Sequence, residues 1–224
     1  MSHPIVLPIG DSAVSVEFGS AIDPLINQQV QALFNKLKGE PPEGVIDLIP
    51  TYRSLLVNYD PFALSFKDLQ TIIFSFGDLS KGVIETTSRL VEIPVCYGKE
   101  FGSDLKEVAA FLHLTEEEVI EIHSKVLYYV YMIGFTPGFP YMGGLDPMLF
   151  MPRKKVPREF VPAGTVGIAD QQTGIYPLDS PGGWQLIGRT PVKLFDLGRK
   201  EPFYLKPGDR VKFKPISEEE FENP

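Results

Sequence analysis

Apolar and polar residues alternate over residues 12–18, and this period of two predicts a half-buried strand. Further predicted strands in the first part of the chain cover residues 45–49, 53–59 and 89–96. Apolar residues at helical spacing follow Asp23-Pro24 and Ser65, both of which are typical helix starts. The predicted order is β-α-β-β-α-β, an α+β unit with the ferredoxin-like split βαβ pattern. Other small α+β sandwiches would give a similar pattern.

The second part of the chain begins with two short predicted helices, 105–112 and 116–124. Thr115 and Glu118 form a capping box for the second of them. Short predicted strands follow, separated by Gly and Pro turns: 128–133, 165–169, 174–176, 184–190, 192–197 and 210–215. Such a series predicts an all-β barrel or sandwich. We therefore expect an N-terminal α+β domain over residues 1–88 and a β-barrel domain over residues 89–224.

Residues 137–189 are unusually rich in Gly and Pro. The 224-residue chain contains 20 Gly and 21 Pro, and 17 of these 41 lie within that stretch of 53 residues. The same stretch contains large aromatic side chains, which favour burial. The segment is therefore interpreted as ordered, turn-rich structure.

Charge and other properties of the sequence limit the possible binding partners and the cellular location. The net charge of −8 argues against nucleic acid or an anionic membrane as a partner. We found no apolar run long enough to span a bilayer and no secretory signal pattern. Cys96 is a lone cysteine, so no internal disulfide forms. We expect a cytoplasmic protein.

Common catalytic motifs are missing from the sequence. It contains neither a P-loop nor a dinucleotide-binding glycine motif, and no G-x-S-x-G elbow. The three histidines are scattered, so we expect no metal site. His123 is a candidate catalytic residue, because it ends a predicted helix whose C-terminus would raise the pKa of the imidazole. The alternative is a packed, structural imidazole.

Three turn-rich segments are the strongest functional signal: 134–145, 161–177 and 180–191. In the first, Pro and Gly fix a non-repetitive backbone path that presents Phe135, Phe139 and Tyr141. This could be a pocket lip with backbone N–H groups for an anion. A hydrophobic plug closing one barrel end is an equal alternative.

The other two segments contain polar and aromatic side chains suited to a small ligand. Gln172 and Gln185 offer amide recognition, while Tyr176 and Trp184 offer flat walls. Arg189 offers a fork for a carboxylate or phosphate. Together they predict a small, anionic, amide-bearing ligand. Alternatively, the two rings are core residues and Arg189 pairs with an acidic neighbour.

At these segments the chain resembles the KipI/PxpB family, also described as allophanate hydrolase subunit 1-like. The matching stretches are GFTPGFPYMGG (134–144), VPAGTVGIA (161–169), QTGIYP (172–177) and SPGGWQLIGRTP (180–191). The resemblance implies an N-terminal α+β domain followed by a cyclophilin-like β-barrel. It also implies these pocket positions: His123, Phe135, Pro137, Gly138, Phe139, Tyr141, Gln172, Tyr176, Gly183, Trp184 and Arg189. The sequence departs from the family at Asp170-Gln171, where a small Gly-rich pair is expected.

The resemblance further implies a function. Family members work with a PxpC-type subunit and PxpA, a LamB/YcsF-type protein, as an ATP-dependent 5-oxoprolinase that opens 5-oxoproline to glutamate. ATP would be shared with the partner subunit, and the chain alone would be inactive. Other members inhibit autophosphorylation of a sensor histidine kinase, which is the alternative function. A third possibility is a carboxyltransferase-like module with a biotin-carrying partner.

The ligand that the resemblance implies matches the one that the residues predict, since 5-oxoproline has a lactam amide and a carboxylate. The sequence predicts that Arg189→Ala weakens substrate use more than folding. It also predicts that His123→Asn impairs turnover.

Overall fold

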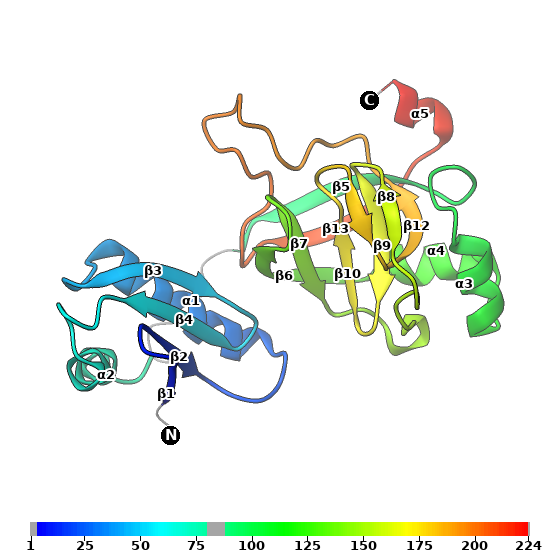
Figure 1. Ribbon diagram of the computed structural model, residues 1–224. Helices are drawn as coiled ribbons and strands as arrows, with labels where there is room; N and C mark the ends of the chain where they lie inside the picture. The colour runs from blue at the N-terminus through cyan, green and yellow to red at the C-terminus, as the bar shows by residue number, and fades with distance from the viewer. Residues whose placement is uncertain (1–3, 80–87, 224) are drawn as a thin grey trace. The chain divides into compact units, whose positions relative to one another are not determined.

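The computed structural model describes residues 4–79 and 88–223. The chain folds as two compact units, Met1–Thr87 and Ser88–Pro224. Each is described by itself below (Figure 1).

The first unit is a sheet with two helices. Its elements are β1 (Ile5–Ile9), β2 (Ala13–Glu17), α1 (Pro24–Gly39), β3 (Val45–Pro50), β4 (Ser54–Tyr59) and α2 (Phe66–Ser75). The described strands form an antiparallel sheet in the order β1-β2-β4-β3. Val14 and Val57 of the sheet pack with Leu33 and Leu69 of the helices in one core.

Both helices of this unit begin where the sequence predicts. The Asp23 carboxylate accepts hydrogen bonds from the Leu25 and Ile26 N–H groups, and Pro24 occupies the first turn. The Ser65 hydroxyl accepts from the Asp68 N–H. These side chains satisfy backbone donors that have no partner inside the helix.

The predicted ferredoxin-like order differs from the observed one. The described part of the first unit reads β-β-α-β-β-α, because Ile5–Ile9 forms an additional strand paired with β2. The strand expected to complete the set, β5 (Leu90–Tyr97), belongs to the second unit, where it pairs with β13 and β12. Local alternation predicts a strand but does not specify its partner.

The second unit contains the barrel. Its elements are β5, α3 (Leu105–Leu112), α4 (Glu116–Lys125), β6 (Leu127–Gly134), β7 (Phe139–Gly143), a 3₁₀ turn (Pro147–Leu149), β8 (Arg158–Val161), β9 (Thr165–Ala169), β10 (Gln172–Ile175), β11 (Ser180–Gly182), β12 (Gln185–Arg189), β13 (Arg210–Pro215) and α5 (Glu218–Glu222). Seven of the described strands close in the order β10-β7-β6-β13-β5-β12-β9. Among these pairs, only β5 and β13 run parallel.

Alternate residues of the barrel strands face two different cores. Val166, Ile168 and Ile187 point into the main core. Their neighbours Ala169 and Leu186 lie in a second cluster on the other face of the same strands. Val161 of β8 also belongs to this cluster, so the β8–β11 pair covers that outer face of the barrel.

Three expectations for this unit are corrected. Residues 134–145 are not irregular throughout, because they include β7, which pairs with β6 and β10. The predicted strand at 192–197 does not form, apart from an isolated bridge between Phe195 and Phe203. A short C-terminal helix, α5, was not predicted; Ser217 and Glu220 form its capping box.

Candidate functional site

The three turn-rich segments meet in one aromatic cluster on the outer face of the barrel. The Phe139 ring lies edge-on to the rings of Tyr176 and Trp184, with 5.3 Å between ring centroids in each pair. Tyr141 contacts Phe139 and Trp184, at 4.9 Å and 6.1 Å. Phe135 adds an edge-on contact with Phe139 at 5.6 Å. Aromatic pairs favour these offset and edge-on geometries.

Most of this cluster is closed to a ligand. Phe139, Tyr176 and Trp184 are buried, and they pack with Val161 and Leu186 as a small core. The expectation of Tyr176 and Trp184 as flat pocket walls is therefore corrected in favour of the alternative, that they are core rings.

Glycines allow the rings to pack this closely. A Cβ on Gly174 would lie 2.9 Å from both the Phe139 and Trp184 rings, and one on Gly182 would lie 2.4 Å from the Tyr176 Oη. A real Cβ needs more room than this, so each ring lies against bare backbone. Gly174 and Gly182, which belong to the glycine-rich stretch 137–189, therefore make the close packing of this small core possible.

The turn between β6 and β7 presents an exposed aromatic side chain. Phe135 is 62% exposed and has φ +62°, a left-handed conformation that is costly for a bulky residue. The Thr136 N–H donates to the Gly134 carbonyl at 2.7 Å, and the Phe139 N–H donates to the Thr136 carbonyl at 3.0 Å. Pro137 is exposed, whereas Gly138 is buried with φ +89°.

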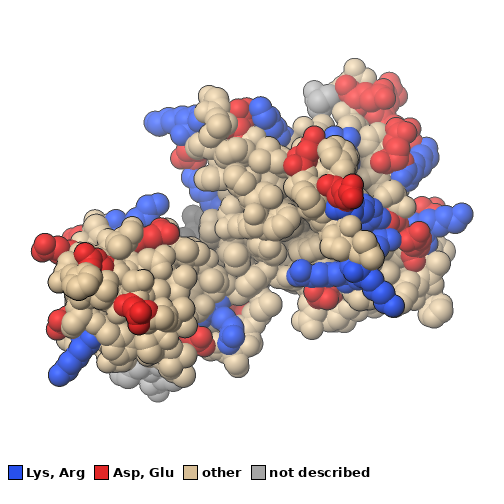
Figure 2. Space-filling model, viewed as in Figure 1, with Lys and Arg blue, Asp and Glu red and all other residues tan. Residues whose placement is uncertain are grey.

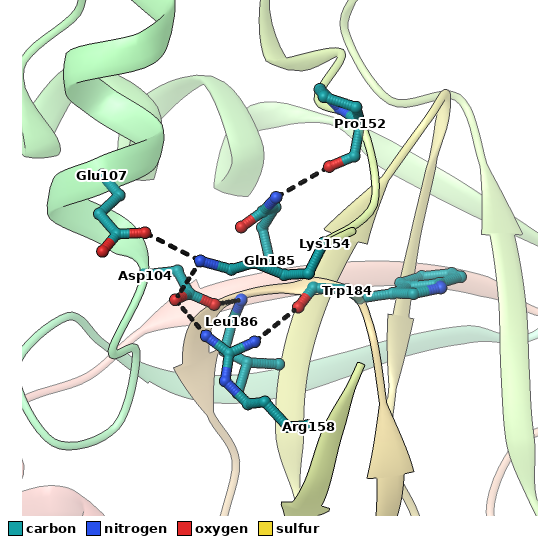
Figure 3. Close-up of polar contacts among 8 residues, drawn as sticks. All are labelled: Asp104, Glu107, Pro152, Lys154, Arg158, Trp184, Gln185 and Leu186. Carbon is teal, nitrogen blue, oxygen red and sulfur yellow. Dashed lines mark hydrogen bonds and ion pairs between the residues drawn. The ribbon is translucent and has the colours of Figure 1, made fainter. Parts of the chain in front are cut away.

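A buried carboxylate organises a group of cations beside Trp184 (Figure 3). Asp104 precedes α3, and its side chain is 3% exposed. One oxygen contacts the Arg158 guanidinium and lies 3.0 Å from Lys154 Nζ, while the other accepts from the Leu186 N–H at 2.7 Å. Lys154 Nζ also lies 2.8 Å from Glu107.

These contacts join the loop before β8 to α3 and β12. Arg158 donates to the Trp184 carbonyl at 3.3 Å, and the Lys154 N–H donates to the Gly183 carbonyl at 2.7 Å. Arg153 lies over the Trp184 ring, 6.0 Å from its centroid, and pairs with Asp170 at 3.1 Å. Residues 153–158 contain four basic side chains, and three of them, Arg153, Lys154 and Arg158, are therefore used in structural contacts.

The two candidate amides lie at one end of the barrel strands. Gln172 begins β10 and is half-buried. Gln185 begins β12, is buried, and donates from Nε2 to the Pro152 carbonyl at 2.8 Å (Figure 3). Its Oε1 is buried with no hydrogen-bond partner within the described ranges. A buried carbonyl oxygen without a donor is costly, which makes it noteworthy.

Arg189 lies at the other end of β12. Gln185 pairs with Ile168 and Arg189 with Thr165, three residues away on β9, so the two backbone positions are about 10 Å apart along the sheet. Gln185 and Arg189 therefore lie at opposite ends of β12, which corrects the expectation that both contact one small ligand. The β6–β7 turn lies at the Arg189 end, because Gly143, not Phe139, pairs with Gln172.

The Arg189 guanidinium remains suited to an anion. Nε donates to the Ala163 carbonyl at 2.9 Å, and the side chain is half-buried. None of the ion pairs between described residues involves Arg189. A guanidinium has five N–H donors, so the Ala163 bond orients the group and leaves its terminal nitrogens for a carboxylate.

His123 differs most from its predicted state. The ring is fully buried in the last turn of α4 and stacks on Phe213 at 4.7 Å. Burial lowers the pKa of His123 from 6.5 to about 3. The expected raised pKa is therefore wrong, because desolvation of the cation outweighs any benefit from the helix C-terminus.

The hydrogen bonds of His123 fix its tautomer. The Thr173 hydroxyl donates to the Gly167 carbonyl at 3.0 Å, so its oxygen must accept from His123 Nε2–H at 2.9 Å. His123 Nδ1 then accepts from the Tyr97 hydroxyl at 2.8 Å. The neutral ring joins α4 to β5 and β10, which matches the alternative of a packed imidazole; an effect on turnover stays a prediction.

Sequence reasoning missed Asp104 and the Tyr97–His123–Thr173 chain. Asp104 stands before a predicted helix, where an acidic residue usually caps the backbone. Here its side chain makes no cap hydrogen bond and instead binds Lys154, Arg158 and the Leu186 N–H. No local pattern distinguishes the two uses.

Metal-binding clusters and membrane-spanning helices were sought among all the described residues. Residues 4–79 and 88–223 contain no group of His, Cys, Asp and Glu side chains that could hold a metal ion. Over the same ranges, we find no helix with the length and apolar character needed to cross a membrane.

The fold and motifs place the chain in a known family. Residues 4–205 match the family described as carboxyltransferase domain, subdomain C and D. The chain belongs to this family. Within it, the chain is 46% identical to a 5-oxoprolinase subunit of Bacillus subtilis (strain 168), across 95% of this chain and 93% of that protein. It is 42% identical to the corresponding 5-oxoprolinase subunit of Escherichia coli O157:H7, across 94% and 95%.

A solved structure adds support for the fold. The crystal structure of TTHA0988 in space group P212121 matches with a TM-score of 0.81 and 43% identity, across 92% of this chain. This chain spans only 40% of the length of TTHA0988. The family match and the relatives confirm the resemblance to the KipI/PxpB family that the motifs indicated.

Proposed function

We propose that this carboxyltransferase-domain family member is a subunit of an ATP-dependent 5-oxoprolinase, which opens 5-oxoproline to glutamate. The observation that carries the proposal is the 46% identity to the Bacillus subtilis 5-oxoprolinase subunit over nearly the full length of both chains. A relative that is one subunit of an enzyme also implies further subunits, and we assign these as a PxpC-type and a PxpA-type protein.

The Arg189 end of the barrel is the proposed substrate contact. The substrate carries a carboxylate, which matches a guanidinium held in place by the Ala163 carbonyl. Gln185 lies at the far end of β12, so it is not part of this proposed contact.

ATP is assigned to the interface with the partner subunit. Opening a lactam is helped by phosphoryl transfer to the amide oxygen, which creates charge that cations and backbone N–H groups must stabilise. The sequence offers neither a P-loop nor a dinucleotide-binding glycine motif. The chain alone is therefore expected to be inactive.

The test is reconstitution from purified subunits. All three proteins are mixed with ATP and 5-oxoproline, and glutamate is measured over time. We expect glutamate only when this chain is present. Equal glutamate formation with the chain omitted would overturn the proposal.

The description of the family also favours carboxyl transfer, which would need a biotin-carrying partner. Avidin distinguishes the two functions because it sequesters biotin. We expect glutamate formation to be unchanged by excess avidin, whereas a carboxyltransferase would be inhibited.

Arg189→Ala tests the substrate contact. We expect kcat/KM for 5-oxoproline to fall by about 100-fold, the effect of losing a charge-assisted bidentate contact of about 3 kcal/mol. Arg53→Ala is a matched control, since Arg53 also donates to a backbone carbonyl, that of Gly19 at 3.0 Å. A lower melting temperature for Arg189→Ala with unchanged kcat/KM would make Arg189 structural.

A further inference from the structure

A long connection between β12 and β13 forms an ordered arm. We define the arm as residues 191–206; apart from the Phe195–Phe203 bridge it contains no strand or helix. It extends away from the barrel in Figure 1. Connections of this length inside a compact domain are uncommon and are usually functional or disordered.

The base of the arm is fixed to the barrel. Leu194 and Leu205 are buried in the main core, and the Tyr204 N–H donates to the Leu194 carbonyl at 2.8 Å. Arg89, which precedes β5, donates to the Tyr204 carbonyl and pairs with Asp209, both at 2.6 Å. The outgoing and returning segments of the arm therefore leave the barrel side by side.

The outer part of the arm is braced around Asp196. Its N–H donates to the Pro202 carbonyl, and its carboxylate accepts from the Gly198 N–H, both at 2.9 Å. The carboxylate also pairs with Lys193 at 3.2 Å. Arg199 donates to the Lys193 carbonyl at 2.9 Å. The arm is thus ordered by its own contacts.

The surface of the arm is apolar at the tip and cationic around it. Leu197 is 79% exposed and Phe203 is 42% exposed. Residues 191–206 have a net charge of +2 in a chain whose net charge is −8. In Figure 2, Lys and Arg side chains lie on both sides of the uncharged tip of the arm, with Asp and Glu side chains between them.

The base of the arm also contacts the turn that presents Phe135. A Cβ on Gly138 would lie 3.1 Å from the Cβ of Phe195, so the turn packs directly against the arm. Arg189 lies two residues before the arm begins. One end of the barrel therefore combines the strained, exposed Phe135 with the apolar tip and the candidate substrate contact.

We propose that the arm and Phe135 are the docking surface for the second subunit of the complex, which offers an apolar socket bordered by carboxylates. This inference rests on the proposed function. A symmetric contact between two copies of this chain would bring two positively charged arms together, so charge disfavours a second copy docked arm to arm. TTHA0988, of which this chain spans only 40%, carries much further protein in the same polypeptide.

The bracing has an energetic consequence for binding. A segment whose backbone is already ordered loses less conformational entropy on binding than a disordered one, so more of the contact energy contributes to affinity. Binding beside Arg189 would also place the partner against the bound substrate.

The experiment measures binding of the full chain to the PxpC-type subunit by isothermal titration calorimetry, together with glutamate formation in the complete mixture. Leu197→Asp places a charge in the socket, and we expect it to raise Kd about 30-fold or more. Phe111→Asp is the control, since Phe111 is 58% exposed on α3, outside the arm. We expect it to bind like the wild type.

Phe135→Gly separates docking from folding. Glycine adopts φ +62° without strain, so the melting temperature should not fall, whereas Kd should rise about tenfold. If Phe135 only supports the fold, the melting temperature will fall and the Kd for the partner subunit will not change.

The outcomes distinguish the two proposals. If the wild type binds and the mixture forms glutamate, but Leu197→Asp binds equally well, the docking surface is wrong and the proposed function stands. If the wild type neither binds nor supports glutamate formation, the proposed function fails and the docking surface fails with it.

Discussion

At the scale of single residues, His123 shows how burial overrides a local signal. Its ring has a hydrogen-bond partner at each nitrogen and none is an anion. Charging the ring would place an uncompensated cation in the barrel, and this lowers the pKa to about 3. The unfolded chain has no such restriction, so it binds a proton near pH 6.5.

This difference predicts acid sensitivity. Because the pKa is lower in the folded state, the unfolded state takes up the proton first, and stability falls as pH drops from 6.5 towards 3. We expect the free energy of unfolding to fall by about 2 kcal/mol between pH 7.5 and pH 5 from this group alone. Urea unfolding titrations at the two pH values measure this loss of free energy. His123→Gln lacks this titration, so an equal loss in that variant would contradict the prediction.

Asp104 is the second residue whose environment sets its importance. Two cations and a backbone N–H converge on its buried carboxylate. We expect Asp104→Asn to lower the free energy of unfolding by about 3–5 kcal/mol, because Lys154 and Arg158 lose their shared anion.

Glu107→Gln is the matched control for Asp104→Asn. Glu107 pairs with the same Lys154, but its side chain is 70% exposed. Solvent screens an exposed pair, so we expect a change of about 0–1 kcal/mol. Urea unfolding of both variants checks the comparison; similar losses would mean that burial of Asp104 is unimportant.

At the scale of elements, two adjacent glycines test how the β8–β11 pair lies on the barrel. A Cβ on Gly182 would meet the buried Tyr176 ring, whereas one on Gly183 would have no neighbour closer than 3.7 Å. Neither glycine has a positive φ. We expect Gly182→Ala to cost about 1–3 kcal/mol and Gly183→Ala less than about 0.5 kcal/mol. Thermal unfolding compares them, and equal melting temperatures would refute the close packing.

At the scale of the whole molecule, each unit has its own core. The core of residues 4–79 draws on both helices and the four described strands, while the barrel fills its interior from its own strands and helices. We predict that residues 88–224 fold without residues 1–87. Circular dichroism and a cooperative thermal transition of that fragment would show it; a fragment without such a transition would contradict the prediction.

The local sequence predicted individual helices and strands better than it predicted which strands pair with one another. The caps at Asp23 and Ser65, and strands such as β9 and β13, follow from residue types and spacing alone. The strand pattern groups β5 with the first unit, although the predicted domain boundary at residue 88 places it in the second, because the sequence of a strand does not specify which strand lies alongside. β7 was missed, since the Pro and Gly around it resemble a continuous loop.

The sequence alone determined the family and the acidic character of the chain, and it directed attention to the three turn-rich segments. Only the tertiary structure decided that Phe139, Tyr176 and Trp184 are core rings, that His123 is neutral, and that Gln185 and Arg189 lie at opposite ends of one strand. The physical reason is that motifs depend on neighbours along the chain. Burial, pKa and separation depend on neighbours in space, which residues distant in the sequence supply.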